Sequence, residues 1–494
     1  MFKINNLIEY LYILRNLIKK NLSFNSIKLF VILRYANYAL SFVRGILLAY
    51  VLAPKDYGYW GYIMLVITLV GYSNVGSDLF INVIYPQERE KNKLYTAHIN
   101  GYTLFHLFIV YILLFLFYFF ESTSSIELTE LILLYLIVGL QVFMKNYTSI
   151  LREMGKIGVI GVFENILLIT TIIPSLLTIL NIVDLTNKEV IDYTLFAWLL
   201  LLVIKFYFFN VQSTYSLFKF KFNFSHYKKV YSIGFPLLIS NVAFYLIIQL
   251  NKYVIKVDLG FEYLGYFNFA SSLTYAILMA FGSVIWAVFP KLIAHFKMIE
   301  VDTKNKVLTS EKFQNIYSFS ILLLSLIVGV FIEFFISYVL PQYTYSIPII
   351  YALIISQFFI STSTIYKTVL IANFKQSVIT IISIIGLVIS LGLSIVFLKN
   401  EGKVIYVAYS ICISYFIVSA LYISYFYFKL VKTKSFLEVL YKEIVPIRFI
   451  IPLALFFIAL EWNDNLLFIS PLLLVVINIK TLKETIKIVR NEKN

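Results

Sequence analysis

The chain has 494 residues, of which 61% are hydrophobic and only 14% are charged, and its formal net charge is +15. In soluble domains about a quarter of the residues are charged, so this composition excludes an ordinary soluble protein and indicates a polytopic membrane protein. The Lys and Arg residues lie in short loops between apolar runs, which is where membrane topology places them, so nucleic-acid binding is excluded as well.

Residues 1–26 precede the first long apolar run. The stretch MFKINNLIEYLYILRNLIKKNLSFNS has apolar residues at helical spacing with basic residues nearby, and it lacks the small-residue cleavage site of a secretory signal. It predicts a cytoplasmic segment that is either a short helix on the inner leaflet or a frayed tail.

Fourteen runs that follow are candidate membrane spans, because a helix needs about 20 apolar residues to cross about 30 Å of hydrocarbon. We expect helices in all of them, since lipid leaves the backbone groups of open sheets unsatisfied. The last two are short and could form a hairpin that crosses only in part. The spans are 27–51, 59–84, 99–120, 130–150, 158–180, 193–213, 230–255, 266–290, 316–340, 348–368, 378–398, 405–428, 447–461 and 466–479.

The loops between these spans differ sharply in positive charge. Of the 41 Lys and Arg residues, 31 lie on the side of the N-terminus and only 5 on the other side. By the positive-inside rule both termini are therefore cytoplasmic.

One turn occurs twice. LAPKDYGYWGY at 52–62 is followed 207 residues later by LGFEYLGYFNF at 259–269. This offset relates the first span to the seventh and the second to the eighth, so the copies keep the same orientation. The pattern predicts a parallel repeat of two six-helix units, with the turn at the outer rim of each unit as a structural element without ligand contact.

The residues around both turns resemble a known family. RGILLAYVLAPKDYGYWGYIMLVITLVGYSNVGSD at 44–78 and SIGFPLLISNVAFYLIIQLNKYVIKVDLGFEYLGYFNFA at 232–270 are similar to the openings of the two lobes of polysaccharide-unit flippases. These are lipid-linked oligosaccharide translocases of the multidrug/oligosaccharidyl-lipid/polysaccharide exporter superfamily. Phe289-Pro290 and LKNEGKVIYVAYSICISY at 398–415 extend the resemblance, whereas Lys55-Asp56 departs from the usual pair of acidic residues in the turn.

The resemblance implies a V-shaped all-α transporter, not an enzyme, in the bacterial inner membrane. Its cargo would be an oligosaccharide on a polyprenyl diphosphate, moved to the outer leaflet by alternating access, with membrane lipids around it and a polysaccharide polymerase and chain-length regulator as candidate partners. No cofactor is implied beyond a proton or sodium gradient. The expected domains are a cytoplasmic segment 1–26, lobes 27–213 and 230–428, their connecting loop 214–229, and a C-terminal hairpin with a basic tail, 429–494.

Ionisable side chains inside the spans are costly, so each is a functional hypothesis. At about 1.5 Å per residue, five of them lie roughly 8 to 12 Å from the cytoplasmic ends of their spans, all in the first lobe. They are Arg34, Asp78, Lys145, Glu164 and Lys205. These five form a layer with three positive and two negative charges. The full set is Arg34, Arg44, Asp78, Lys145, Glu164, Lys205, Lys252 and Glu333.

The positive members fit an anionic head group, because Lys and Arg donate charge-assisted hydrogen bonds to phosphate. We expect head-group binding by Arg34, Arg44, Lys145, Lys205 and Lys252, and by Asn241, which takes the place of Arg34 in the second repeat. Asp78, Glu164 and Glu333 are candidates for ion coupling. The alternative is that the charges only pair to fasten helices, or extend to the interface.

Two rival functions remain open. A drug and toxin extruder of the same superfamily would share the fold, but the excess of buried positive charge favours an anionic cargo. A membrane glycosyltransferase or polymerase would need an acidic metal motif or a large outer loop. The acidic pair Glu300 and Asp302 lies among cytoplasmic lysines, and neither Cys412 nor the scattered histidines offer metal-ligand spacing.

Overall fold

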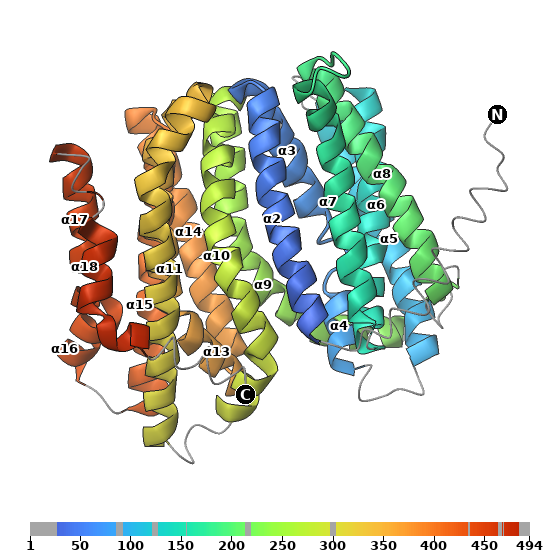
Figure 1. Ribbon diagram of the computed structural model, residues 1–494. Helices are drawn as coiled ribbons and strands as arrows, with labels where there is room; N and C mark the ends of the chain where they lie inside the picture. Colours follow the sequence, from blue (N-terminus) through green and yellow to red (C-terminus); the bar gives the residue numbers. More distant parts are fainter. Residues whose placement is uncertain are drawn as a thin grey trace. The chain divides into compact units, whose positions relative to one another are not determined.

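The computed structural model describes residues 27–84, 92–120, 127–154, 156–212, 219–296, 303–432, 435–462, 467 and 469–483. These described residues are mostly helical and contain no strand (Figure 1). The segment 1–26, predicted to lie at the cytoplasmic interface, is outside the described residues.

Each predicted span corresponds to a helix or to a pair of consecutive helices. The first six spans contain α2 (Ile27–Val51), α3 (Pro54–Val70), α4 (Ser77–Ile84), α5 (Asn92–Phe120), α6 (Leu128–Glu153), α7 (Ile157–Ile179) and α8 (Asn187–Gln212). The others, with their connections, contain α9 (Phe224–Leu259), α10 (Phe261–Phe296), α11 (Thr303–Val339), η3 (Pro341–Ser346), α12 (Ile347–Ser361), α13 (Thr364–Ala372), α14 (Gln376–Glu401), α15 (Ile405–Ser424), η4 (Tyr425–Val431), α16 (Phe436–Val439), η5 (Leu440–Ile444), α17 (Ile447–Trp462) and α18 (Ile469–Ile477).

The helices have the length and composition of membrane spans. Among the described residues, seven helical segments are by themselves long and apolar enough to cross a bilayer, or eight if the bent pair Leu437–Ile444 and Ile447–Leu460 forms one span. The prediction of an all-α polytopic membrane fold is confirmed.

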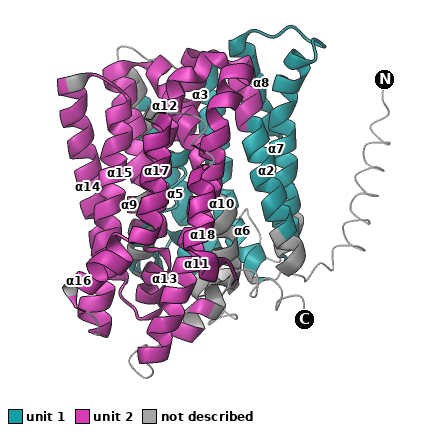
Figure 2. Cartoon of the chain, turned by 60° about the vertical axis from the view of Figure 1, so that its left-hand side comes forward, with its two compact units in different colours: residues 1–44, 66–238 teal, residues 45–65, 239–494 magenta. Residues whose placement is uncertain are grey.

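The chain divides into two compact units (Figure 2). Unit 1 comprises residues 1–44 and 66–238, and unit 2 comprises residues 45–65 and 239–494. The boundaries fall inside α2, α3 and α9, so each of these helices contributes one part to each unit. The lobe boundaries expected from the repeat stay a prediction, because the units are defined by packing and not by repeat symmetry.

Unit 1 is a bundle in which α5, α6, α7 and α8 run side by side (Figure 1). Helix α8 packs against both α6 and α7, and the short α4 packs against α6. These contacts bring α4, α6, α7 and α8 together, and these four helices carry four of the eight charges predicted inside the spans: Asp78, Lys145, Glu164 and Lys205.

Unit 2 is built around α10, α12, α14 and α15, with α11 packed against both α10 and α12. The first copy of the repeated turn belongs to this unit. Its Tyr57 is buried and lies edge-on to Tyr343 of η3 with ring centroids 5.7 Å apart, while the Tyr343 hydroxyl donates to the Leu52 carbonyl oxygen at 3.1 Å. The turn is therefore held by packing and backbone hydrogen bonding.

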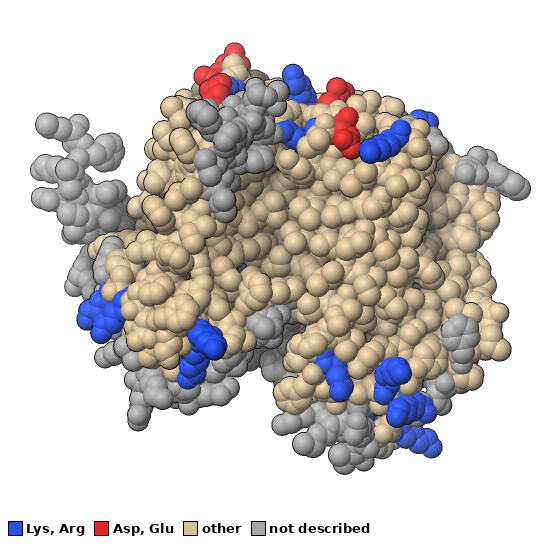
Figure 3. Space-filling view, turned by 180° about the vertical axis from the view of Figure 1, so that it is seen from behind, with Lys and Arg blue, Asp and Glu red and all other residues tan. Residues whose placement is uncertain are grey.

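Charged side chains avoid a broad band of the described surface. On the face shown in Figure 3, Lys and Arg gather along one edge, and both signs of charge appear along the opposite edge. The band between the two edges is free of charge on this face, as expected of a surface that meets lipid.

Candidate functional site

The first charged cluster of unit 1 depends on a close approach of α7 to α2. A Cβ at Gly161 would lie 3.0 Å from the Leu33 side chain, so the glycine allows the two helices to meet closely. One turn further along α7, the Asn165 amide donates to the Leu33 carbonyl oxygen at 2.9 Å. These contacts set the register of the two helices and place Arg34, which follows Leu33, opposite Glu164, which precedes Asn165.

Arg34 and Glu164 form an ion pair inside this helix contact. Arg34 Nη1 donates to Glu164 Oε2 at 2.6 Å. The Arg34 side chain nevertheless exposes 33% of its surface and that of Glu164 exposes 25%. The pair therefore fastens α2 to α7 and still presents a guanidinium surface that a ligand can reach.

Lys205 of α8 completes the cluster. It is buried, with 8% of its surface exposed. Its ammonium interacts electrostatically with both Glu164 and Arg34, and lies 5.3 Å from the centroid of the Phe209 ring. Among the described residues of this cluster, two cations thus share one carboxylate, an excess of one positive charge.

The second cluster is built on a break in the second span. Helix α3 ends at Val70 and α4 begins at Ser77, and Val75 and Gly76 between them have positive φ angles of 52° and 87°. At Gly76 only glycine fits, because a Cβ would also lie 2.3 Å from the Gly234 carbonyl oxygen. The predicted single helix 59–84 is therefore interrupted by an irregular turn over 71–76.

Lys145 of α6 and Asp78 of α4 lie at this break. Lys145 Nζ donates to the Gly71 carbonyl oxygen at 2.6 Å and lies 4.4 Å from the centroid of the Tyr72 ring. The Asp78 carboxylate accepts from the Asn74 amide at 2.7 Å and attracts the Lys145 ammonium electrostatically.

The remaining predicted residues are Arg44, Asn241, Lys252 and Glu333. Arg44 is partly buried on α2, and Asn241 is part of α9, although its side chain is outside the described set. Lys252 of α9 donates to Asn268 Oδ1 at 2.7 Å in unit 2. Glu333 of α11 is exposed and accepts a long hydrogen bond of 3.5 Å from the Tyr351 hydroxyl. Their roles in binding or coupling stay predictions.

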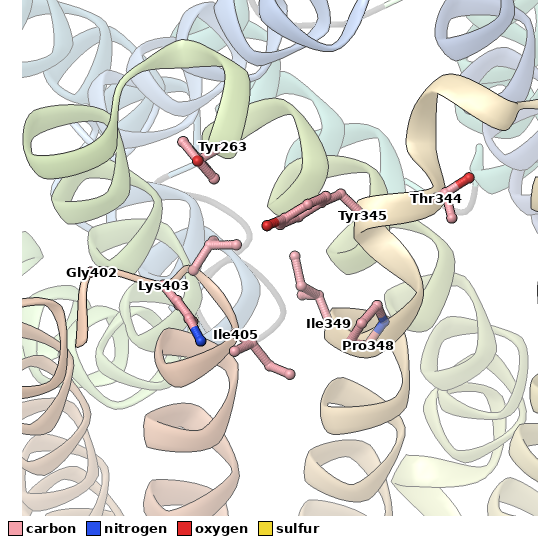
Figure 4. A pocket seen from close by; sticks show the side chains of 9 residues that line it. Tyr263, Thr344, Tyr345, Pro348, Ile349, Gly402, Lys403 and Ile405 are labelled. Carbon is pink, nitrogen blue, oxygen red and sulfur yellow. The ribbon is translucent and has the colours of Figure 1, made fainter. Parts of the chain in front are cut away.

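A cavity of about 390 Å³ opens on unit 2 (Figure 4). Tyr263 of α10, Tyr345 of η3 and Lys403 from the connection between α14 and α15 line it, and the Tyr345 ring extends into it. None of the residues predicted to bind a head group lines this cavity.

The sequence prediction missed the asparagines that position both clusters. Asn165 follows Glu164, and Asn146 follows Lys145; the Asn146 amide oxygen accepts from the Ser77 hydroxyl at 2.8 Å and so joins α6 to α4. A charged residue followed directly by asparagine within an apolar run is a signal that could have revealed them.

The comparison with known families identifies the chain. Residues 47–304, more than half of the chain, match the model of a family described as polysaccharide biosynthesis protein. No protein with a curated description matches the chain in sequence.

Solved structures share the fold at low sequence identity. The lipid II flippase MurJ, in an inward closed conformation, is similar with a TM-score of 0.64 and 17% identity over 93% of this chain and 99% of that one. An inward-facing multidrug resistance MATE family transporter of the MOP superfamily has a TM-score of 0.61 and 16% identity over 82% of this chain and 100% of its own. An outward-facing MATE family transporter of that superfamily has a TM-score of 0.55 and 14% identity over 84% and 96%.

Proposed function

We propose, from the premise that the chain belongs to the polysaccharide biosynthesis protein family, that it is a flippase for polyprenyl-diphosphate-linked oligosaccharides. It is a multi-pass membrane protein with the fold of the MOP superfamily. The proposed cargo is a repeat unit of O-antigen, capsule or a related polysaccharide, carried from the cytoplasmic to the outer leaflet of the bacterial inner membrane by alternating access, with both termini in the cytoplasm.

The observation that carries this proposal is the cluster of Arg34, Glu164 and Lys205. Among the described residues, this cluster holds two cations, Arg34 and the buried Lys205, and one carboxylate, and an excess of positive charge is costly within a membrane unless an anion can join it. A diphosphate supplies that anion. It can form charge-assisted hydrogen bonds with Arg34, whose side chain is 33% exposed.

The energy source of the transport cycle is a separate question. Glu164 and Asp78 are the acidic groups of the two clusters, and either would bias a two-state equilibrium if it bound a proton or a metal cation in one conformation only. The polymerase and chain-length regulator remain candidate partners of the proposed pathway.

A gene deletion tests the proposal in cells. Loss of the protein should leave lipid-linked repeat units on the cytoplasmic leaflet while their synthesis continues. Arg34→Ala should reproduce this accumulation although the protein still inserts, and Lys399→Ala, which removes an exposed cation of α14, serves as the control that keeps export.

Two outcomes of the deletion experiment would favour a different function. If deletion abolished assembly of the lipid-linked unit, a glycosyltransferase or polymerase would be indicated instead. If deletion left the units normally distributed but made cells sensitive to cationic drugs, the chain would be a drug extruder of the same superfamily.

A further inference from the structure

The connection from α8 to α9 combines exposed aromatic and basic side chains. Its part 219–229 reads KFKFNFSHYKK, with four lysines and no acidic residue. Three phenylalanines alternate with polar residues and expose 46%, 55% and 74% of their surface: Phe220, Phe222 and Phe224. Large apolar side chains that gather on a surface indicate a contact with another molecule. This connection lies outside the predicted spans, so its exposed phenylalanines need a covering of their own.

Contacts with α5 fix the backbone of this connection. The Lys221 backbone amide donates to the Ala97 carbonyl oxygen at 3.0 Å, and the Tyr102 hydroxyl donates to the Asn223 carbonyl oxygen at 2.6 Å. A Cβ at Gly101 would lie 2.3 Å from the Lys221 carbonyl oxygen, so only glycine allows this close approach. The backbone is thus held against α5 while the phenylalanine side chains remain on the surface.

The phenylalanines continue the apolar surface of a membrane span. The Phe222 ring lies edge-on to Phe105 of α5, with ring centroids 5.8 Å apart. Phe105 is exposed, and so is Phe108, one turn further along α5. Both belong to the predicted span 99–120, whose exposed apolar side chains meet lipid. A surface that continues this lipid-facing side beyond the end of the span is therefore best covered by lipid as well.

The lysines indicate which kind of lipid this is. Lys219, Lys221 and Lys228 are exposed beside the phenylalanines. The positive-inside rule places this connection at the cytoplasmic leaflet, where basic residues next to a span are attracted to anionic lipids. An ammonium group also donates charge-assisted hydrogen bonds to phosphate oxygens. The combined chemistry is that of a lipid with a negatively charged head group.

We propose that residues 219–228 form a binding site for an anionic phospholipid of the cytoplasmic leaflet. The three phenylalanines insert among the acyl chains close to the head groups, and the three exposed lysines bind the lipid phosphate. Because the connection joins the predicted lobes 27–213 and 230–428, the bound lipid holds this junction at the membrane surface. The lipid is a partner of the protein and not its cargo, so the inference goes beyond the proposed function.

Thermal unfolding of the purified full-length protein in detergent tests the site. Added phosphatidylglycerol should raise the unfolding temperature of the wild type by about 2 to 4 °C in a saturable manner. Phosphatidylcholine with the same acyl chains should not. The triple variant Lys219→Gln, Lys221→Gln, Lys228→Gln should lose most of this rise, and Phe220→Ser should reduce it.

The matched control is a triple variant of three exposed lysines in unit 2 on the same predicted side of the membrane: Lys304→Gln, Lys312→Gln, Lys429→Gln. It should keep the rise. An equal loss in this control would show a general attraction by positive charge and would overturn the proposal. So would a wild type without a rise, an equal rise with phosphatidylcholine, or the same rise with inorganic pyrophosphate, which has no acyl chains.

Spin labelling decides the question if the lysine variant does not fold. A nitroxide attached at Phe220→Cys, with the single native cysteine replaced by Cys412→Ser, should be more accessible to dissolved oxygen than to a water-soluble nickel chelate in phosphatidylglycerol liposomes. A nitroxide at Lys188→Cys, an exposed position at the start of α8, should show the reverse order. The reverse order at position 220 would place the connection in water or against a soluble partner and would contradict the proposal. Because none of these measurements involves a cargo, they can fail while the flippase function stands.

Discussion

Gly58 of α3 and Gly265 of α10 lie against each other through their backbones in unit 2. A Cβ at Gly58 would lie 1.7 Å from the Phe261 carbonyl oxygen, and a Cβ at Gly265 would lie 1.9 Å from the Pro54 carbonyl oxygen. Both Gly58 and Gly265, and Pro54 and Phe261, are separated by the 207 residues of the sequence repeat. The contact is therefore self-complementary in the manner of a two-fold interface, formed here between two copies within one chain.

Alanine at either glycine should separate α3 from α10. A backbone oxygen cannot move aside as a side chain can, so we expect Gly58→Ala and Gly265→Ala each to destabilise the protein by about 1 to 3 kcal/mol or more. Thermal unfolding in detergent measures this effect. Gly392→Ala is the matched control, because Gly392 lies in α14 with no atom within 4 Å of its Cβ position, and it should be neutral or slightly stabilising. Equal stability of all three variants would contradict the contact.

The repeat is not symmetric below this contact. Gly61 of the first copy corresponds to Asn268 of the second, and a Cβ at Gly61 would lie 2.7 Å from the Asn268 side chain. Gly61→Ala should therefore destabilise the protein by about 1 to 3 kcal/mol, and the double variant Gly61→Ala, Asn268→Ala should recover part of the loss. The recovery should be incomplete, because Lys252 would lose its acceptor on Asn268. A strictly additive double variant would show that the two residues do not touch.

Lys205→Met separates the charge of the first cluster from its ion pair. The substitution removes the excess positive charge while the Arg34–Glu164 pair remains, so the protein should fold at least as well as the wild type. Export should fall at least tenfold if the positive charge attracts the cargo, as measured by the fraction of lipid-linked units on the outer leaflet. Lys399→Met removes an exposed lysine and should change neither quantity. Normal export by a folded Lys205→Met would assign Lys205 to helix packing.

A buried acid–tyrosine network holds η5 against α13. The Tyr366 hydroxyl donates to Glu443 Oε2 at 2.5 Å, and Glu443 is 8% exposed. Tyr366→Phe should reduce the free energy of unfolding by about 1.5 to 3 kcal/mol, since the lost hydrogen bond is to a charged acceptor. Tyr338→Phe, which alters an α11 tyrosine with 76% of its surface exposed, should have no effect in the same unfolding assay. A similar loss in both variants would rule out a specific role for the bond.

The sequence predicted the helices and the charged residues because both are imposed by the membrane. Apolar length specifies a span, and a charge such as Lys205 within a span is conspicuous because it is costly. The sequence alone could not predict which of these charges pair. The pairing of Arg34 with Glu164 depends on which face of α7 packs against α2 and on the small Gly161 between the two helices.

The break at 71–76 was missed for a different reason. Hydropathy averages over about 20 residues, and the flanking apolar residues outweigh the polar stretch YSN. Locally, Asn74 Oδ1 accepts from the Gly76 backbone amide at 3.4 Å, and such side-chain hydrogen bonds compete with helix formation. The paired glycines of GYSNVG were the available signal.

The central claim is tested most directly by transport in reconstituted vesicles. Purified protein in liposomes that contain a polyprenyl-diphosphate-linked oligosaccharide should expose the cargo on the opposite leaflet, where an added impermeant lectin or glycosidase detects it. We predict that the wild type moves the cargo, that protein-free vesicles do not, and that Arg34→Ala moves it at least tenfold more slowly. Wild-type vesicles that leave the oligosaccharide on its original leaflet while they transport a cationic dye would contradict the account.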